Sequence, residues 1–76
     1  MWFVYLLLCA DDTIYTGSTN NLEKRILAHN NGTGAKYTKG RGPVKLLRFF
    51  ECESKSEALI LEYKIKQLTR AEKFKL

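Results

Sequence analysis

The segment VYLLLCADDTIYTGSTNNLEKRILAH, residues 4–29, determines how the rest of the chain folds. An apolar run over residues 2–9 leads to a turn at Asp11 and Asp12, and the chain returns through residues 14–17. Aspartate tolerates tight-turn backbone and offers local hydrogen bonds, so this pattern predicts a β-hairpin. The first run is apolar without alternation, which is typical of a strand buried on both faces. We therefore expect it at the centre of its sheet.

The length of the hairpin loop decides whether Tyr5 and Tyr15 lie on one face of the sheet. Side chains alternate along a strand, so a two-residue loop at Asp11-Asp12 would direct the two rings to opposite faces. A loop with an odd number of residues, or a bulge, would bring both rings to the same face. If both tyrosines serve one site, the sequence predicts the odd or bulged hairpin.

A helix is predicted after the hairpin, because residues 18–21 form a cluster of N-cap residue types. Leu22 and Ile26 have the spacing of its buried stripe, and Arg25 and His29 lie four residues apart on an adjacent stripe. The helix therefore carries a permanent cation and an imidazole side by side.

The second half of the chain predicts a strand over residues 44–52 and two helices after it. Ser54 with Glu57, and Thr69 with Glu72, have the spacing of capping boxes. The full order is β-β-α-β-α-α. It predicts one α+β domain over residues 1–76, with a three-stranded antiparallel sheet flanked by helices.

Composition limits the class of protein and its compartment. The 76 residues allow one small core, and the net charge of +5 favours a polyanionic partner, either nucleic acid or an anionic membrane surface. The apolar N-terminal run is too short to span a bilayer and lacks a basic leader segment. Cys9 and Cys52 have no metal-ligand spacing and are typical of small buried hydrophobes in a reducing compartment. We expect a cytoplasmic protein.

A glycine-rich loop over residues 32–43 carries further positive charge. The residues suited to contacting nucleic acid there and just beyond are Lys36, Tyr37, Lys39, Arg41 and Lys45. A flexible backbone with cations and one aromatic ring suits phosphate contacts. A plain surface loop has the same composition, so both interpretations stay open.

An ordered set of residues resembles the GIY-YIG nuclease domain. The matching positions are Tyr5, Tyr15, Gly17, Arg25, His29 and Glu62. The resemblance covers essentially the whole chain and indicates the small stand-alone bacterial members of that superfamily. The chain departs from the motif at Phe3-Val4, at Thr16 in place of isoleucine, and in having no asparagine after Glu62.

The resemblance implies a metal-dependent DNA endonuclease that hydrolyses phosphodiester bonds with Mg²⁺ or Mn²⁺. By the same resemblance Tyr5 and Tyr15 are the motif tyrosines, Gly17 the motif glycine, Arg25 the catalytic arginine and Glu62 the metal ligand. A chain this short has no room for a separate DNA-recognition domain, so we expect little sequence specificity. A role in DNA repair or recombination is what the resemblance to these nucleases implies.

Elementary chemistry supports these roles and leaves the proton acceptor open. Arg25 offers phosphate a planar charged fork, and Mg²⁺ is often held by one or two carboxylates with phosphate and water. Tyrosine has an ordinary pKa of about 10, so nearby cations would have to lower it for a tyrosine to act as base. Tyr5 is the first candidate and Tyr15 a second that would orient the water. His29 titrates nearer neutrality and is a third.

Each of these residues also has a purely structural interpretation. The tyrosines would be core residues, Arg25 and His29 a solvated helix face, and Glu62 an ion-pair partner of a lysine four residues on. Two rival functions follow: a non-catalytic nucleic-acid-binding module, or an interaction domain active only with a partner repair protein. No long apolar stretch is left over once the core is assigned, so we expect a monomer.

Overall fold

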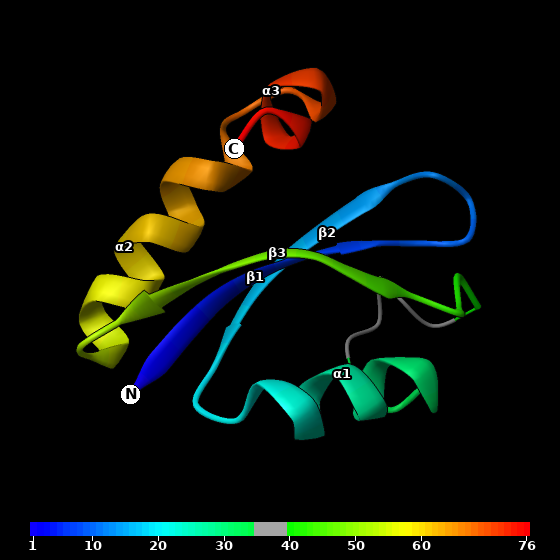
Figure 1. Ribbon diagram of the computed structural model, residues 1–76, viewed down its shortest axis with the longest axis horizontal. Helices are drawn as coiled ribbons and strands as arrows, with labels where there is room; N and C mark the ends of the chain where they lie inside the picture. The colour runs from blue at the N-terminus through cyan, green and yellow to red at the C-terminus, as the bar shows by residue number, and fades with distance from the viewer. Residues whose placement is uncertain (35–39) are drawn as a thin grey trace.

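The computed structural model describes residues 1–34 and 40–76, and within them the chain forms three strands and three helices (Figure 1). The elements are β1 (Trp2–Leu8), β2 (Ile14–Thr19), α1 (Leu22–Asn30), β3 (Lys45–Cys52), α2 (Lys55–Lys66) and α3 (Arg70–Phe74). The strands form one antiparallel sheet in the order β2-β1-β3. The predicted α+β fold and its element order are confirmed.

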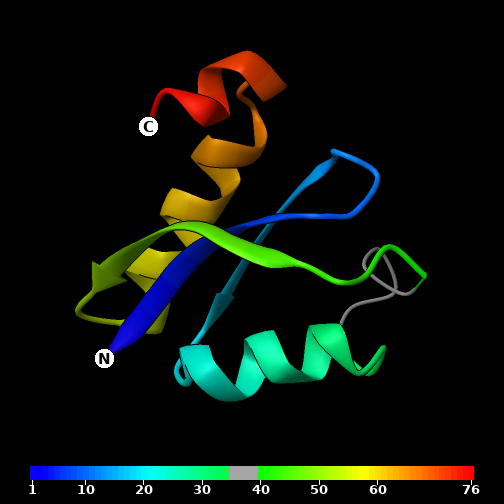
Figure 2. The same cartoon turned by 45° about the vertical axis from the view of Figure 1, so that its right-hand side comes forward.

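The central strand β1 is buried on both faces, as its apolar run predicts. Val4 and Leu6 pack in a cluster with α2, while Tyr5 and Leu7 pack on the opposite face in a cluster with α1. Figures 1 and 2 show α1 on one side of the strands and α2 with α3 on the other. The helix α1 therefore covers the face that carries Tyr5.

The β1–β2 hairpin has the odd-length loop that the sequence predicts for a shared tyrosine face. Leu7 lies opposite Tyr15 and Tyr5 lies opposite Gly17, so five residues, 9–13, connect the strands. The amide of Cys9 donates to the carbonyl of Thr13 at 2.9 Å and closes this loop. Both tyrosine rings consequently point toward α1.

The two predicted capping boxes form differently. Thr69 and Glu72 make the reciprocal box at the start of α3. At α2 the Ser54 side chain accepts from the amide of Glu57, but the Glu57 carboxylate accepts at 2.8 Å from the amide of Glu53. The predicted bond from the Ser54 amide to the Glu57 carboxylate is wrong, because this carboxylate accepts from the amide of the residue before the N-cap.

The strand β3 lies at the edge of the sheet and exposes large apolar side chains. Leu46, Leu47 and Phe49 are exposed, and the β1–β3 register shifts by one residue between Leu6 and Leu7. The premise that no apolar stretch is left over is therefore wrong for β3. The monomeric state itself stays a prediction.

Two simpler expectations concern the cysteines and membranes. Cys9 and Cys52 are buried free thiols, as the sequence predicts. Among residues 1–34 and 40–76, no helix is both long and apolar enough to cross a membrane.

Candidate active site

Three elements bring the four predicted catalytic side chains together. Tyr5 comes from β1, Tyr15 from β2, and Arg25 and His29 from successive turns of α1. The ring centroids of Tyr5 and Tyr15 are 6.2 Å apart, and those of Tyr5 and His29 5.7 Å. The Tyr15 and His29 rings are closer still, at 5.1 Å. We call this group of four side chains the tyrosine–histidine cluster.

A hydrogen-bond chain runs through the tyrosine–histidine cluster. Arg25 Nε donates to the Tyr5 hydroxyl oxygen over 3.4 Å, and that hydroxyl lies 2.9 Å from His29 Nε2. A guanidinium can only donate, so the Tyr5 oxygen accepts from Arg25. That oxygen has a second lone pair, so the direction of its bond to His29 Nε2 depends on which ring nitrogen carries the hydrogen. In the tautomer with the hydrogen on Nδ1, the Tyr5 hydroxyl donates to Nε2.

His29 is a buried residue, so its interpretation as part of a solvated helix face is wrong. Only 1% of it is exposed. Burial, together with the nearby charge of Arg25, lowers the pKa of His29 below its ordinary value. The imidazole is therefore neutral at pH 7, and in the tautomer with the hydrogen on Nδ1 its Nε2 accepts from the Tyr5 hydroxyl.

The environment of Tyr5 works against a resting phenolate. The residue is 0% exposed, and burial raises the pKa of its hydroxyl above the ordinary value, although the hydrogen bond from Arg25 acts in the opposite direction. The lowering of the tyrosine pKa that a nearby cation was expected to produce is thus outweighed by desolvation. Tyr15 is only partly buried and is the more accessible of the two rings.

Arg25 is the charged member of the cluster that can reach a substrate. Hydrogen bonding to Tyr5 raises the pKa of the Arg25 guanidinium, and interactions with Tyr15 add to this effect. The side chain is partly buried and lines a groove of about 240 Å³ that also includes Thr19 and Lys24. A permanent cation therefore lies between the two tyrosines and an open groove.

Gly17 allows the two tyrosine rings to lie over the backbone of β2. A Cβ atom at this position would lie 2.6 Å from the Tyr5 hydroxyl oxygen and 2.9 Å from Cε2 of Tyr15. No side chain fits there without displacing one ring. A glycine is therefore required at this position for steric reasons, and not only because the strand ends nearby.

Two positioning residues could not be identified from the sequence. A Cβ atom on Gly34 would lie 2.6 Å from His29 Nδ1, so the glycine lets the chain pass close to the imidazole. Asn30 Oδ1 accepts from the amide of Val44 at 2.7 Å, which connects the end of α1 to the start of β3. Neither contact has a local sequence signal, because each depends on how distant segments meet.

Glu62 lies on α2 and is already paired. Its Oε2 is 2.6 Å from Lys66 Nζ, so the predicted structural ion pair is confirmed, and the glutamate side chain is only 16% exposed. Burial is the main cause of the raised pKa of Tyr5, but the charge of Glu62 adds to it, so the carboxylate lies within electrostatic range of the cluster. Within the described residues no three His, Cys, Asp or Glu side chains gather as a metal site.

Two of the five predicted nucleic-acid contacts fall within the described residues, and neither lies at the cluster. Lys36, Tyr37 and Lys39 lie outside the described residues. Arg41 makes an ion pair with Asp11 of the hairpin loop. Lys45 lies opposite Leu8, whose side chain packs in the α2 cluster, so Lys45 is on the sheet face remote from α1.

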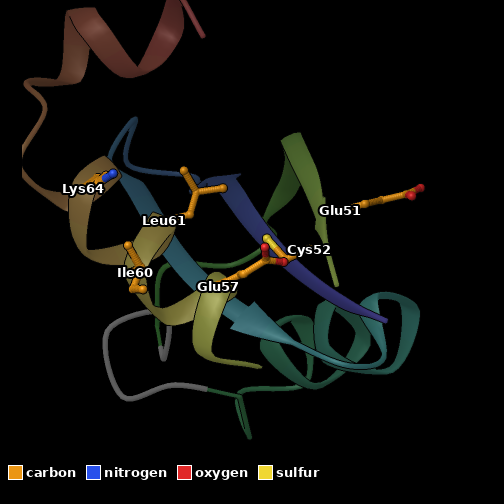
Figure 3. Close-up of a pocket in the computed structure, with 6 residues that line it drawn as sticks. All are labelled: Glu51, Cys52, Glu57, Ile60, Leu61 and Lys64. Atoms are coloured by element: carbon orange, nitrogen blue, oxygen red, sulfur yellow. The ribbon is translucent and has the colours of Figure 1, made fainter. Parts of the chain in front are cut away.

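A separate hollow between α2 and the end of β3 contains none of the predicted site residues (Figure 3). Cys52 and Glu57 line it from opposite elements, whereas Glu51 points away in this view. Burial, with a smaller contribution from Glu57, raises the pKa of the Cys52 thiol. The thiol is therefore protonated near neutral pH and is a poor nucleophile.

The chain matches a known protein family over nearly its whole length. The family model of the GIY-YIG catalytic domain matches residues 1–75. A UPF0213 protein of Clostridium perfringens is 63% identical over 100% of this chain and 82% of its own length. A UPF0213 protein of Natronomonas pharaonis is 51% identical over 97% of this chain and 87% of its own length.

Two solved structures share the fold. The solution NMR structure of a UPF0213 protein from Bacillus halodurans has a TM-score of 0.59 and 46% identity, covering 96% of this chain and 79% of the other. An NMR structure of a protein from E. faecalis has a TM-score of 0.64 and 41% identity, covering 96% of this chain and 78% of the other. The domain match implies a nuclease-type function. The chain belongs to the GIY-YIG family, and its close relatives are small UPF0213 proteins.

Proposed function

We propose that this protein is a metal-dependent DNA endonuclease that hydrolyses phosphodiester bonds with little sequence specificity. The observation that supports this most is the hydrogen-bonded chain from Arg25 through Tyr5 to His29, next to an open groove. Phosphodiester hydrolysis needs a phosphate-binding cation, a positioned water and a proton acceptor, and the cluster offers a side chain for each of these tasks.

Arg25 would bind the phosphate group that is attacked. Its guanidinium is permanently charged and presents parallel donors that match two phosphate oxygens. The Arg25–Tyr5 hydrogen bond is long, at 3.4 Å, so exchanging it for a phosphate contact costs little. Movement of Arg25 toward the phosphate would also uncover the Tyr5 oxygen.

The proton of the attacking water would leave through Tyr5 to His29. The Tyr5 oxygen accepts that proton as its own hydrogen passes to His29 Nε2, so no free phenolate is needed. The raised pKa of Tyr5 and the lowered pKa of His29 fit this relay, because they keep the phenol protonated and the imidazole neutral at rest. Tyr15, the more accessible ring, would orient the water.

The donor chemistry of Glu62 fits a divalent cation held jointly with substrate. Mg²⁺ commonly takes one or two carboxylates, with phosphate oxygens and waters completing an octahedron. The described residues offer no three-ligand cage, so Mg²⁺ or Mn²⁺ would bind here mainly in the presence of the nucleic acid. When bound, the cation supplies charge neutralisation at the phosphate. Glu62 would need to exchange its contact with Lys66 to serve as the ligand.

Binding to DNA would rest on phosphate contacts and on the net charge of +5. The loop residues Lys36, Tyr37 and Lys39 remain proposed contacts, with Arg41 and Lys45 as weaker candidates because they lie away from the cluster. We place such an enzyme in the cytoplasm, as a monomer in DNA repair or recombination, with a repair protein as its possible partner.

The experiment that tests this function is cleavage of supercoiled, branched and single-stranded DNA at low salt with Mg²⁺ or Mn²⁺. We expect cutting that stops with a chelator and is strongly slowed in Glu62→Gln. Glu51→Gln, an exposed carboxylate on β3, is the matched control and should cut like wild type. Cutting that survives the chelator, or that Glu62→Gln performs at the wild-type rate, would contradict the metal assignment.

The rival with a structural observation behind it is a nucleic-acid-binding module without catalysis. Glu62 is paired with Lys66 and Tyr5 is fully buried, and both features are also what a packed, inactive site would show. A salt-titrated DNA-binding assay separates this module from the third possibility, a domain that acts only with a repair protein. Cleavage alone separates an enzyme from a binder.

A further inference from the structure

A third hollow lies between β2 and the C-terminal helices, and it shares Tyr15 with the tyrosine–histidine cluster. It has a volume of about 320 Å³ and is lined by Ile14, Tyr15 and Thr16 from β2, Lys66 from α2 and Lys73 from α3. We call it the β2–α3 pocket. Its walls are held in place by the Thr69–Glu72 capping box and by Arg70, whose Nε donates to the carbonyl of Asp12 at 2.8 Å.

The lining of the β2–α3 pocket is positively charged. Lys66 and Lys73 contribute two ammonium groups, and no carboxylate lines the pocket. Lys66 is paired with Glu62, whereas Lys73 is partly buried and makes no ion pair within the described part of the chain. A cation in a recess without a carboxylate of its own favours an anionic ligand.

A buried hydroxyl points to the same conclusion. Thr16 is 3% exposed, and its Oγ1 has no hydrogen-bond partner among residues 1–34 and 40–76. Thr16 lies opposite Leu6, which packs in the α2 cluster, so its side chain is on the sheet face toward Lys66. Isoleucine, the residue of the family motif at this position, would leave no such hydroxyl unsatisfied. Thr16 lines the pocket, so a ligand oxygen that displaces the atoms covering this hydroxyl would satisfy it.

Two residues of the β2–α3 pocket contact members of the candidate active site. Tyr15 lines the pocket and also contacts His29, with ring centroids 5.1 Å apart. Lys66 lines the pocket and makes an ion pair with Glu62, the proposed metal ligand. The pocket is therefore next to the site, where a neighbouring phosphate of a bound strand would lie.

We propose that the β2–α3 pocket binds the phosphodiester next to the one that is cut, on the same nucleic-acid strand. Lys73 is its principal charged contact, Thr16 contributes a hydroxyl hydrogen bond, and Lys66 becomes available when Glu62 turns to the metal. This inference rests on the proposed function. It adds a direction for the bound strand, which would run from the groove beside Arg25, past Tyr15, toward α3.

The test is binding of a fluorescent single-stranded oligonucleotide, by anisotropy across a salt series without metal, to wild type, Lys73→Ala and Lys75→Ala. Both variants lose one charge from the same end of the chain, but only Lys73 lines the pocket. We expect Lys73→Ala to weaken binding and to reduce the slope of log K against log salt by about 0.7, the value for one phosphate contact on a single strand. Lys75→Ala should change the slope much less, and Lys73→Arg should restore it.

Thr16→Val provides a second, independent variant. It should raise the melting temperature, because it removes an unsatisfied buried hydroxyl without changing the side-chain volume greatly, and it should weaken oligonucleotide binding. A purely structural role for Thr16 would leave binding unchanged. Equal slopes for Lys73→Ala and Lys75→Ala, or unchanged binding in Thr16→Val, would overturn the proposal.

Inorganic phosphate distinguishes a strand from a free anion. Amide NMR shifts at Thr16 and Lys73 should appear with the oligonucleotide and be much smaller with inorganic phosphate at the same phosphate concentration. Shifts with inorganic phosphate alone would overturn the assignment to a strand. Because these readouts need no cleavage, failure of the pocket is distinguishable from failure of the nuclease. An inactive protein can still show the Lys73 effect, and an active one can lack it.

Discussion

At the scale of single residues, the site depends on how closely a few side chains approach the backbone. Tyr5 and Tyr15 share one face because an odd loop sets the register, and Gly17 lies directly opposite Tyr5 where no Cβ fits. The hydroxyl of Tyr5 is then within hydrogen-bond distance of a neutral, buried His29. The Tyr5–His29 contact is therefore a consequence of steric fit as much as of acid–base chemistry.

Gly17→Ala should lower both stability and cleavage. The added methyl would lie 2.6 Å from the Tyr5 oxygen, so one ring must move, and we expect a loss of about 1–3 kcal/mol in the free energy of unfolding. Urea denaturation measures this. Gly42→Ala is the control, since a Cβ there meets nothing within 4 Å. Equal stability of the two variants would show that the tyrosine rings are not packed over β2 as described.

The buried His29 should make stability depend on pH. Its pKa is lowered in the folded state by burial and by Arg25, so the unfolded chain, with a histidine pKa of about 6.5, binds the proton first. The stabilisation is therefore present above pH 6.5 and is lost as the pH falls, by at most about 1.4 kcal/mol per pH unit. Urea unfolding between pH 8 and 5 should show this slope in wild type and not in His29→Gln. Parallel curves would contradict a neutral buried imidazole.

At the scale of helices and strands, local patterns predicted most of the fold. The apolar run of β1, the Ser54 cap and the Thr69–Glu72 box all depend on neighbours within a few residues, and these predictions are confirmed. The hydrogen bond from the Glu53 amide to the Glu57 carboxylate was not predicted, because a carboxylate at this position can accept from either of two adjacent amides. Which amide it bonds depends on side-chain geometry that sequence spacing does not specify.

Ser54→Ala should destabilise α2 and hence the domain. Ser54 accepts from the amide of Glu57 at the start of the helix, and losing such a cap costs about 1 kcal/mol. Thermal unfolding should show a lower midpoint than for Ser56→Ala, which removes an exposed hydroxyl from the first turn of the same helix. If the two serine variants melt together, the cap contributes nothing to folding.

At the scale of the whole molecule, the sequence named candidate site residues but could not predict how each one is placed in the structure. Tyr5, Arg25 and Glu62 all match positions of the family motif. In the structure Arg25 donates a hydrogen bond to Tyr5, whereas Glu62 makes an ion pair with Lys66. Burial of His29 and the recess around Lys73 depend on contacts between segments far apart in the chain. Periodicity and spacing carry no information about such distances.

The exposure of apolar side chains on β3 is a second property of the whole molecule that could not be predicted from the sequence. Leu46, Leu47 and Phe49 belong to an apolar run that reads like core, yet β3 has a neighbour on one side only, and these residues remain exposed. The sequence does not indicate this exposure, because an edge strand and a central strand have similar apolar patterns.

The most direct test of the catalytic role of the tyrosine–histidine cluster is the rate at which Arg25→Ala nicks supercoiled DNA with Mg²⁺ or Mn²⁺. Arg48→Ala is the control, because it removes the same charge from the opposite face of the sheet. With both variants shown to be folded by circular dichroism, we predict a loss of at least about 100-fold for Arg25→Ala, the scale of losing one transition-state donor, and a rate close to wild type for Arg48→Ala. Equal rates for wild type and both variants would contradict the account, because Arg25 would then take no part in cleavage.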